Sequence, residues 1–274
     1  MGIFDGYLFC ADCDGTMTDD QGVLQPEDAE AINYFQQEGG LFTFATGRFP
    51  KYIDKFLDMF HPNTYQVMGN GTTLYDVDHG RAIFNVTMEP PREVLQYIWD
   101  HDLSRMVYVD HYNHSRTWCG DPEVMKSPWM QGREYFTEPE DLFSYDPEPW
   151  HKIDITFRTP EEGDRVEAIL KQQFPKETFV RSWATGMEML PRGAGKGPCV
   201  MELKKILGPK IHTVVCAGDY GNDVSMIQLA DIGYCVANGS EEAKAAADRI
   251  TCSNEEHAIR QIVRDLEAEA GSLR

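Results

Sequence analysis

An apolar run from Tyr7 to Ala11 ends abruptly in two acids, in the stretch Asp12-Cys13-Asp14-Gly15-Thr16. A short apolar run that stops at a turn signal predicts a buried strand, and Gly15 lets the chain turn sharply away. Asp12 and Asp14 are therefore expected just past the carboxyl end of that strand, where open α/β sheets place their ligands. Two acids there suggest a site for a divalent cation or a nucleophilic aspartate. A solvated turn without a function is the alternative that Asp-x-Asp alone leaves open.

The length and composition fit a globular protein. The 274 residues predict two domains, and 42% hydrophobic with 26% charged residues is usual for a soluble fold. No apolar run approaches the roughly 18 residues of a membrane-spanning helix, and the N-terminus lacks the features of a signal peptide. Seven cysteines without regular spacing fit reduced thiols. We therefore expect a cytoplasmic protein with no membrane partner.

The net charge of −20 at pH 7 narrows the set of partners. A strongly acidic chain repels nucleic acids and anionic membrane surfaces, so neither is expected to bind. It also repels an anionic substrate unless local cations offset the charge. A phosphate site in this chain would therefore need a metal ion and at least one well-placed Lys or Arg.

A second apolar run, Leu41 to Ala45, ends in Thr46-Gly47-Arg48. A hydroxyl at a strand end can donate a hydrogen bond to a phosphate oxygen, and the backbone N–H after Gly47 can add another. A plain turn at the start of a helix is the alternative. A third run, Tyr65–Met68, is followed by Asn70 in an Asn-Gly pair, which favours a hairpin turn. Asn70 could still face the site, because this strand should neighbour the first.

Lys196 precedes a helix that is predicted from Pro198 to about Leu207. A P-loop is excluded because Gly197 stands where a Walker A motif needs Ser or Thr. A lysine at the N-terminus of a helix makes an anion site, because its charge adds to the positive end of the helix dipole. Lys196 is therefore the local cation that an acidic phosphate-binding chain requires.

A second acidic strand end follows the apolar run Thr213–Ala217, in the stretch Gly218-Asp219-Tyr220-Gly221-Asn222-Asp223. Asp219 would complete a magnesium site with the acids of the first motif if the two strands are neighbours. Asn222 and Asp223 could instead cap the following helix. We expect capping and site roles together.

The stretch from about residue 78 to residue 186 has a different pattern, in which short strand-like pieces alternate with helical patterns at 91–101 and 160–173. This pattern predicts a compact α+β insert. Within it, His111, His114 and Cys119 could suggest zinc, but a second ligand pair is missing and a polar hairpin tip is favoured. Cys10-x-x-Cys13 also lacks a second pair, so neither a redox nor a zinc role is expected.

The four polar strand and helix ends resemble, in order, the four motifs of the haloacid dehalogenase (HAD) superfamily of phosphatases. The last motif is followed by Val-Ala-Asn-Gly and Lys-Ala-Ala-Ala-Asp, which is similar to the Cof-type subfamily, class IIB, with a C2-type cap. The resemblance implies an α/β fold with a doubly wound, mostly parallel-sheet core over residues 1–78 and 187–274. It also implies an inserted α+β cap over residues 79–186, which would set substrate specificity.

The resemblance also implies a role for each motif residue. Asp12 would be the nucleophile and Asp14 the general acid/base. The residues expected to bind the phosphorylated substrate are Thr46, Gly47, Arg48, Lys196 and Asn222. The residues expected at a Mg²⁺ site are Asp12, Asp14 through its main-chain carbonyl, Asp219, and Asp223 as an outer partner.

The implied function is Mg²⁺-dependent hydrolysis of small phosphate monoesters through an aspartyl-phosphate intermediate. Sugar phosphates are the first expectation for the substrate, and a phosphorylated cofactor such as pyridoxal phosphate or a flavin nucleotide is the second. A phosphotransferase or phosphomutase would pass the same phosphoryl group to another hydroxyl. A non-catalytic phosphometabolite-binding protein is a third possibility, against which intact Asp12 and Asp14 argue. A monomer or a small homo-oligomer is expected.

Overall fold

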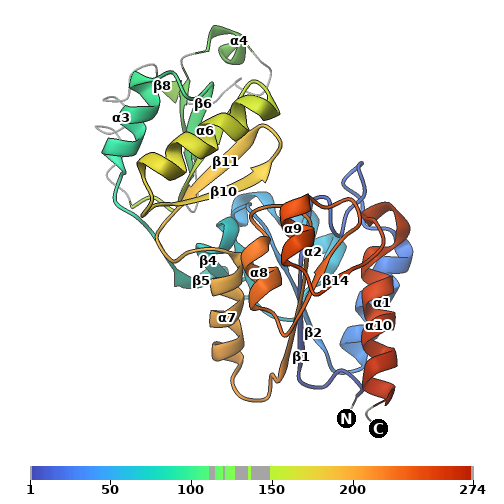
Figure 1. The fold of residues 1–274 in the computed structure, drawn as a ribbon. Coiled ribbons are helices and arrows are strands. Elements are labelled where there is room, and N and C mark those ends of the chain that lie inside the picture. Colours follow the sequence, from blue (N-terminus) through green and yellow to red (C-terminus); the bar gives the residue numbers. More distant parts are fainter. Residues whose placement is uncertain (1, 111–114, 120, 127–134, 137–148, 273–274) are drawn as a thin grey trace. The chain divides into compact units, whose positions relative to one another are not determined.

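The computed structural model describes residues 2–110, 115–119, 121–126, 135–136 and 149–272 (Figure 1). The chain forms two compact units, which are described separately. The core unit consists of Met1–Asn85 and Gly195–Arg274, and the insert unit consists of Val86–Ala194.

The core unit is built on one eight-stranded sheet with the order β14-β13-β12-β1-β2-β3-β4-β5. Its strands from β14 to β3 run parallel, whereas β4 and β5 continue the sheet as antiparallel strands. This mostly parallel sheet confirms the predicted α/β class. The strands are β1 (Tyr7–Asp12), β2 (Leu41–Ala45), β3 (Gln66–Met68), β4 (Thr73–Asp76), β5 (Arg81–Asn85), β12 (Thr213–Gly218), β13 (Ile232–Cys235) and β14 (Arg249–Ile250).

Helices cover both faces of this sheet. Figure 1 shows α1 and α10 on one side of β1 and β2, and α7 and α8 on the other. The helices of the core unit are α1 (Pro26–Gln37), α2 (Asp54–Phe60), α7 (Lys196–Leu207), α8 (Val224–Leu229), α9 (Glu241–Ala246) and α10 (Ala258–Ser272), with short 3₁₀ turns η1 (Pro50–Tyr52), η2 (Gly69–Gly71) and η4 (Asn254–Glu256).

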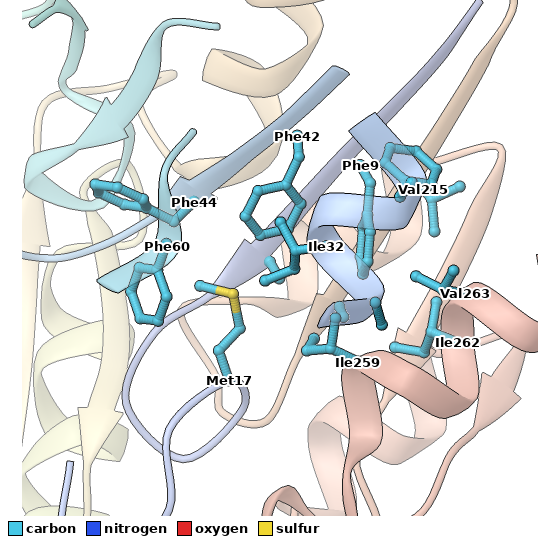
Figure 2. Close-up of a cluster of buried hydrophobic side chains, with 14 of the residues drawn as sticks. Phe9, Met17, Ile32, Phe42, Phe44, Phe60, Val215, Ile259, Ile262 and Val263 are labelled. Carbon is cyan, nitrogen blue, oxygen red and sulfur yellow. The ribbon is translucent and has the colours of Figure 1, made fainter. Parts of the chain in front are cut away.

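The two faces of the sheet bury separate hydrophobic clusters because successive side chains of a strand point to opposite sides. Phe9 of β1 packs with Ile32 of α1 and Ile262 of α10, as Figure 2 shows. Its neighbour Leu8 packs on the opposite face with Val200 of α7. Near-continuous apolar strands are therefore needed here, and this explains the uninterrupted runs in the sequence.

The insert unit has a six-stranded sheet with the order β10-β11-β9-β6-β7-β8. Its pairs are antiparallel except for β7 with β8. Its two long helices, α3 and α6, confirm the helical patterns predicted at 91–101 and 160–173. The elements are α3 (Arg92–Asp100), β6 (Met106–Asp110), β7 (Ser115–Cys119), α4 (Pro122–Met125), β8 (Tyr135–Phe136), β9 (Lys152–Thr156), α6 (Pro160–Gln173), β10 (Thr178–Trp183) and β11 (Gly186–Leu190).

One face of the insert sheet is apolar and the other is polar. Ile153 and Ile155 of β9 pack with Ile98 of α3 and Val166 of α6 in one buried cluster. The alternate residues of the same strand therefore point to the opposite face. There Lys152 Nζ donates hydrogen bonds of 2.9 Å to Asp154 Oδ1 and to Glu188 Oε1, and lies 3.4 Å from Asp110 Oδ2.

The boundaries between the two units differ from the predicted domain boundaries at 78/79 and 186/187. The insert unit begins at Val86 and ends at Ala194. Arg81–Asn85 forms β5, which pairs with β4 and extends the core sheet. Gly186–Leu190 forms β11, which lies between β9 and β10 of the insert sheet. The pairing partner of each strand thus sets the unit to which it belongs.

The described parts of the chain include no helix with the length and apolar composition that crossing a membrane requires.

Candidate active site

Three carboxylates meet at one edge of the core sheet. Asp12 ends β1 and Asp219 directly follows β12, and these strands are parallel neighbours with Ala11 opposite Ala217. Parallel neighbours bring their carboxyl ends to the same edge. Oxygen atoms of Asp12, Asp219 and Asp223 accordingly lie within 4.8 Å of one another. The predicted metal site required β1 and β12 to be neighbouring strands, and they are.

Lys196 lies between two of these acids. It is the first residue of α7 and its side chain is completely buried. Its ammonium donates a hydrogen bond to Asp12 Oδ1 and another, of 2.6 Å, to Asp223 Oδ1. Burial works against the charge of Lys196, but the two carboxylates hold its pKa above the ordinary value. The cation expected from the acidic composition is thus placed beside the first motif.

The close packing of α7 on α8 requires glycine at position 197. A Cβ atom at this position would lie 2.2 Å from the carbonyl oxygen of Ser225, so only glycine lets the two helices approach this closely. The Gly197 N–H donates a 3.1 Å hydrogen bond to Ser225 Oγ. This contact fixes the N-terminus of α7 and hence the base of the Lys196 side chain. The glycine that excludes a P-loop therefore has a packing role.

Asp223 uses both carboxylate oxygens within the protein. Oδ1 accepts from Lys196, and Oδ2 accepts backbone hydrogen bonds from Asp219 at 2.9 Å and Tyr220 at 3.1 Å. This carboxylate therefore folds the loop after β12 around itself and fixes the position of Asp219.

Asp219 is held by a residue that the sequence did not identify. Thr16 Oγ1 donates a 2.9 Å hydrogen bond to Asp219 Oδ1. Burial and the nearby Asp223 charge raise the pKa of Asp219 to about 7. Gly15 has a φ of +85°, and a Cβ there would lie 2.8 Å from Asp219 Oδ2. The signal for Thr16 was its place in Asp-Gly-Thr, directly beyond the acids.

The charge and donor set of this cluster fit a divalent cation. With all three carboxylates ionised, the cluster and its one ammonium would carry a net charge of −2 in a buried site, and this crowding of negative charge is one cause of the raised pKa values of Asp12 and Asp219. Burial raises the pKa of Asp12 well above its usual range, with Lys196 opposing this rise. A buried site with this excess of anionic oxygen is stabilised by a hard cation. The residues present can therefore hold a metal ion.

Asp14 and Arg48 are paired with each other rather than with the acid cluster. Arg48 Nη2 lies 3.0 Å from Asp14 Oδ2 and 3.3 Å from Asp14 Oδ1. Both side chains are about half exposed, at 46% for Arg48 and 56% for Asp14. Arg48 was predicted to contact substrate, and in this structure its guanidinium holds the second acid of the first motif.

Thr46 and Asn222 are both hydrogen-bonded to Asn70. Thr46 is buried, and its carbonyl oxygen accepts a 2.9 Å hydrogen bond from the Asn70 N–H. Asn222 Nδ2 donates a 3.1 Å hydrogen bond to Asn70 Oδ1. A Cβ at Gly47 would lie 3.2 Å from Asn70 Nδ2, so the side chain of Asn70 passes close to the second motif. Asn70 thus connects the second and fourth motifs as well as forming the turn between β3 and β4.

The other cysteine and histidine motifs give no metal cluster that the structure describes. His111 and His114 lie outside the described residues, while Cys119 Sγ donates weak hydrogen bonds to main-chain carbonyls. Cys10 and Cys13 are buried free thiols. Among the described residues, the only cluster of three metal-ligating side chains is the one at Asp12.

The sequence from residue 9 to residue 263 matches the model of the haloacid dehalogenase-like hydrolase family. Phosphatase YwpJ of Bacillus subtilis is 24% identical over 288 aligned residues, which cover 94% of this chain and 99% of that protein. Pyridoxal phosphate phosphatase YbhA of Escherichia coli is 25% identical over 274 residues, which cover 93% of this chain and 97% of that protein.

Solved structures share the fold. The HAD subclass IIB sugar phosphatase BT4131 has a TM-score of 0.79 at 18% identity, with 95% of this chain and 99% of that chain covered. The superfamily and its Cof-type class, predicted from the four motifs, are confirmed. The predicted enzyme class, a phosphoric monoester hydrolase, agrees with the names of these relatives. Because the family match spans most of its length, this chain belongs to the haloacid dehalogenase-like hydrolase family.

Proposed function

We propose that this protein is a Mg²⁺-dependent phosphatase that hydrolyses small phosphate monoesters through an aspartyl-phosphate on Asp12. One observation carries the proposal, namely the buried carboxylate of Asp12 held by the ammonium of Lys196 at the carboxyl end of β1. The arrangement combines a nucleophilic oxygen with a fixed positive charge. Phosphoryl transfer depends mainly on such positioning and charge stabilisation.

A carboxylate oxygen of Asp12 would attack the phosphorus atom. The bond between phosphorus and the leaving oxygen of the ester would break as the new bond between Asp12 and phosphorus forms. Lys196 offsets the negative charge that would otherwise keep an anionic phosphate away from an anionic carboxylate. Because Lys196 is buried and also held by Asp223, its ammonium needs no reorganisation during the reaction. The hydroxyl of Thr46, the backbone at Gly47 and the amide of Asn222 are proposed to bind the phosphate oxygens.

Asp14 is proposed to act as the general acid and base. It would protonate the leaving oxygen and then take a proton from the water that hydrolyses the aspartyl-phosphate. Its exposed carboxylate can exchange protons with solvent, and Arg48 fixes its orientation through the 3.0 Å contact. Arg48 is therefore proposed to bind substrate only at the edge of the phosphate site.

The metal is proposed to be held by Asp12, Asp219 and the main-chain carbonyl of Asp14, with Asp223 as an outer partner. Mg²⁺ would supply a second positive charge for the phosphate oxygens. The outer role for Asp223 is supported by its two carboxylate oxygens, which already accept three hydrogen bonds.

Sugar phosphates are the proposed substrate class, and the insert unit is proposed to select among them. One support is the related fold of BT4131, which is a sugar phosphatase. A second is the polar face of the insert sheet, where Asp110, Asp154 and Glu188 surround Lys152. These four side chains are at most 12% exposed and pair with one another, and Asp154 Oδ2, which has no hydrogen-bond partner among the described residues, is the acceptor proposed for a sugar hydroxyl. Pyridoxal phosphate, the substrate named for YbhA, is the second choice.

The cysteines and the net charge of the chain support a compartment and a class of partner. All seven cysteines are free thiols, and six of them are buried, which supports a reducing compartment. A cytoplasmic location is therefore proposed. The net charge of −20 supports a small phosphorylated metabolite as the partner.

The central experiment measures phosphate release with Mg²⁺ across sugar phosphates, pyridoxal phosphate and flavin mononucleotide. Asp12→Asn is the matched control, since it keeps the size of the side chain and removes the nucleophile. We expect a fall in rate of roughly 10³-fold or more with an unchanged circular dichroism spectrum. Equal rates for both proteins would disprove the mechanism. Addition of glycerol separates hydrolysis from phosphotransfer, because a phosphotransferase would form glycerol phosphate.

The role of the insert is tested by Glu188→Gln. This change keeps a hydrogen-bond acceptor for Lys152 and removes one negative charge. We expect KM for the preferred sugar phosphate to rise while KM for p-nitrophenyl phosphate, which has no hydroxyls, stays constant. Glu161→Gln, on the exposed surface of α6, is the control. Equal changes of KM for both substrates would contradict a selecting role.

A further inference from the structure

The core unit contains a cavity of about 320 Å³ that is separate from the acid cluster. Its lining includes Leu41 and Gln66, the first residues of β2 and β3, and Leu207, the last residue of α7. The acid cluster lies at the carboxyl ends of the parallel strands, so the cavity lies at the opposite edge. β2 has five residues, which at about 3.3 Å per residue separates Leu41 from Thr46 by roughly 16 Å.

The inner part of the cavity is apolar. Leu41, Tyr65 and Leu207 are partly buried side chains that pack against the hydrophobic cluster beneath α7. Pro62 and Val77 extend this lining. A ligand with an apolar body would therefore bury its surface here without displacing the core.

The outer part of the cavity carries two opposite charges. Lys210 and Asp78 line the cavity, and both residues are exposed. Within the described part of the chain, neither side chain forms an ion pair or a hydrogen bond. Asp76, the third charged residue of the lining, is already bound to His79 at 2.8 Å and lies 3.9 Å from Arg81. An ammonium and a carboxylate thus remain available for a ligand.

Gln66 also lies in the wall of this cavity. It is only 1% exposed, and its Nε2 donates a 2.5 Å hydrogen bond to the carbonyl oxygen of Thr64. Its Oε1 is buried without a hydrogen-bond partner among the described residues. A buried amide oxygen that lacks a donor is costly, and native proteins usually satisfy it. This oxygen is buried behind the cavity wall, so Lys210 and Asp78 remain the charged groups that a ligand can reach.

We propose that this cavity binds a free α-amino acid with an apolar side chain. The carboxylate of such a ligand would pair with Lys210, its ammonium with Asp78, and its side chain with the apolar lining. The volume is at the lower end of the range of about 300–1,000 Å³ for small-molecule sites, which suits a ligand of this size better than a nucleotide. The site is distinct from the proposed phosphatase site and uses none of its residues.

The test is a calorimetric titration of the full chain with L-phenylalanine, L-phenylalaninamide and N-acetyl-L-phenylalanine. The amide lacks the carboxylate and the acetyl derivative lacks the ammonium. We expect L-phenylalanine to bind about fivefold more tightly than either, since each analogue loses one partly exposed ion pair. Binding heat does not depend on phosphatase activity, so this result stands apart from the proposed reaction.

Two exposed substitutions locate the binding site. Lys210→Ala should remove the difference between L-phenylalanine and its amide, and Asp78→Asn should remove the difference between L-phenylalanine and its acetyl derivative. Lys205→Ala and Asp58→Asn change exposed residues of the core unit outside the cavity lining and should have no effect. Absence of saturable binding at millimolar concentrations would overturn the proposal. Binding that both cavity variants leave unchanged would place the ligand elsewhere and would overturn it too.

Discussion

Lys196 donates a hydrogen bond from its buried ammonium to Asp12, although the two residues are 184 positions apart in the sequence. Asp12 ends β1, and Lys196 begins α7 on the far side of the insert unit in the sequence. The contact therefore joins the two chain segments that form the core unit. It also means that the charge balance of the site depends on correct assembly of both segments.

The first prediction concerns this cation. Lys196→Met should abolish phosphatase activity and lower the free energy of unfolding of the metal-free protein by about 3 kcal/mol, because buried Asp12 and Asp223 would lose their shared partner. Urea unfolding in the presence of EDTA, followed by circular dichroism, measures the loss.

Two further variants show whether charge is the cause. Lys196→Met removes the one positive charge of the cluster, and the added change Asp223→Asn removes one of the two carboxylates that this leaves without a partner. The double variant should recover part of the stability but none of the activity. Lys204→Met, in the same helix but 31% exposed and paired with Asp231, should cost less than about 1 kcal/mol. Equal costs for Lys196 and Lys204 would contradict the account.

The central parallel strands β1, β2, β3 and β12 could be predicted because each is a short apolar run that ends at a polar turn. The unit boundaries could not be predicted in the same way. Arg81–Asn85 is partly exposed and has only three consecutive apolar residues, so β5 gave no clear signal. Met187–Leu190 falls within the predicted core segment 187–274, yet it pairs with β9 and β10 of the insert sheet. A local sequence pattern can indicate a strand, but it does not show which strand it pairs with.

The same limit applies to the candidate site. Asp12, Lys196, Asp219 and Asp223 could be predicted to converge because each ends or begins a regular element at the same edge. The contacts from Thr16 to Asp219 and from Asn222 to Asn70 join residues separated by 203 and 152 positions. Neither residue of such a pair has a sequence signature for the other.

The second prediction concerns the metal. Mg²⁺ should support activity, and Ca²⁺ should inhibit it when added to the Mg²⁺ enzyme. Few protein ligands are available, which suits Mg²⁺ because it keeps several waters, whereas Ca²⁺ takes about six to eight oxygen ligands in looser geometry. Ca²⁺ would therefore engage more of the Asp12 carboxylate, the group that must attack. Steady-state rates over a range of Ca²⁺ at fixed Mg²⁺ test this, and comparable rates with either ion alone would contradict it.

The third prediction concerns stability and pH, at a site remote from the acid cluster. Asp28 in α1 is buried, and its Oδ1 accepts a 2.8 Å hydrogen bond from the Arg260 N–H in the first turn of α10. Burial raises the pKa of Asp28, and the Arg260 N–H and His257, whose Nδ1 lies 3.6 Å from Asp28 Oδ2, only partly oppose this. A raised pKa in the folded state means that the stabilising contribution is complete below the unfolded pKa, near about 3.9, and is lost as the pH rises through the folded pKa.

The comparison is with Asp28→Asn, which keeps the acceptor for Arg260 and cannot ionise. The free energy of unfolding of the wild type, relative to this variant, should fall as the pH rises above about 4. Urea unfolding at a series of pH values measures the difference. Glu30→Gln, an exposed position of the same helix, should show no such trend. A difference that grows with pH would show that the Asp28 carboxylate is stabilised by its partners.

The last prediction concerns Asp14, which is proposed to protonate the leaving oxygen and then to deprotonate the attacking water. A sugar phosphate needs both functions, because its alkoxide is a poor leaving group. p-Nitrophenyl phosphate needs only the second, because its phenolate leaves readily. Asp14→Asn should therefore nearly stop the first step with a sugar phosphate, whereas with p-nitrophenyl phosphate it should allow that step and stall hydrolysis of the intermediate.

The expected observation with p-nitrophenyl phosphate is a burst of nitrophenolate, at most about one equivalent per site, together with a phosphorylated Asp12. Rapid-mixing absorbance and mass measurement after acid quenching detect the two products. Arg48→Ala is the matched control, since it removes the group that orients Asp14 but leaves the carboxylate in place. It should slow the reaction without accumulating the intermediate. If Asp14→Asn instead turns over p-nitrophenyl phosphate at the wild-type steady rate with no phosphoenzyme, Asp14 is not the acid/base, and its contribution reduces to its main-chain carbonyl.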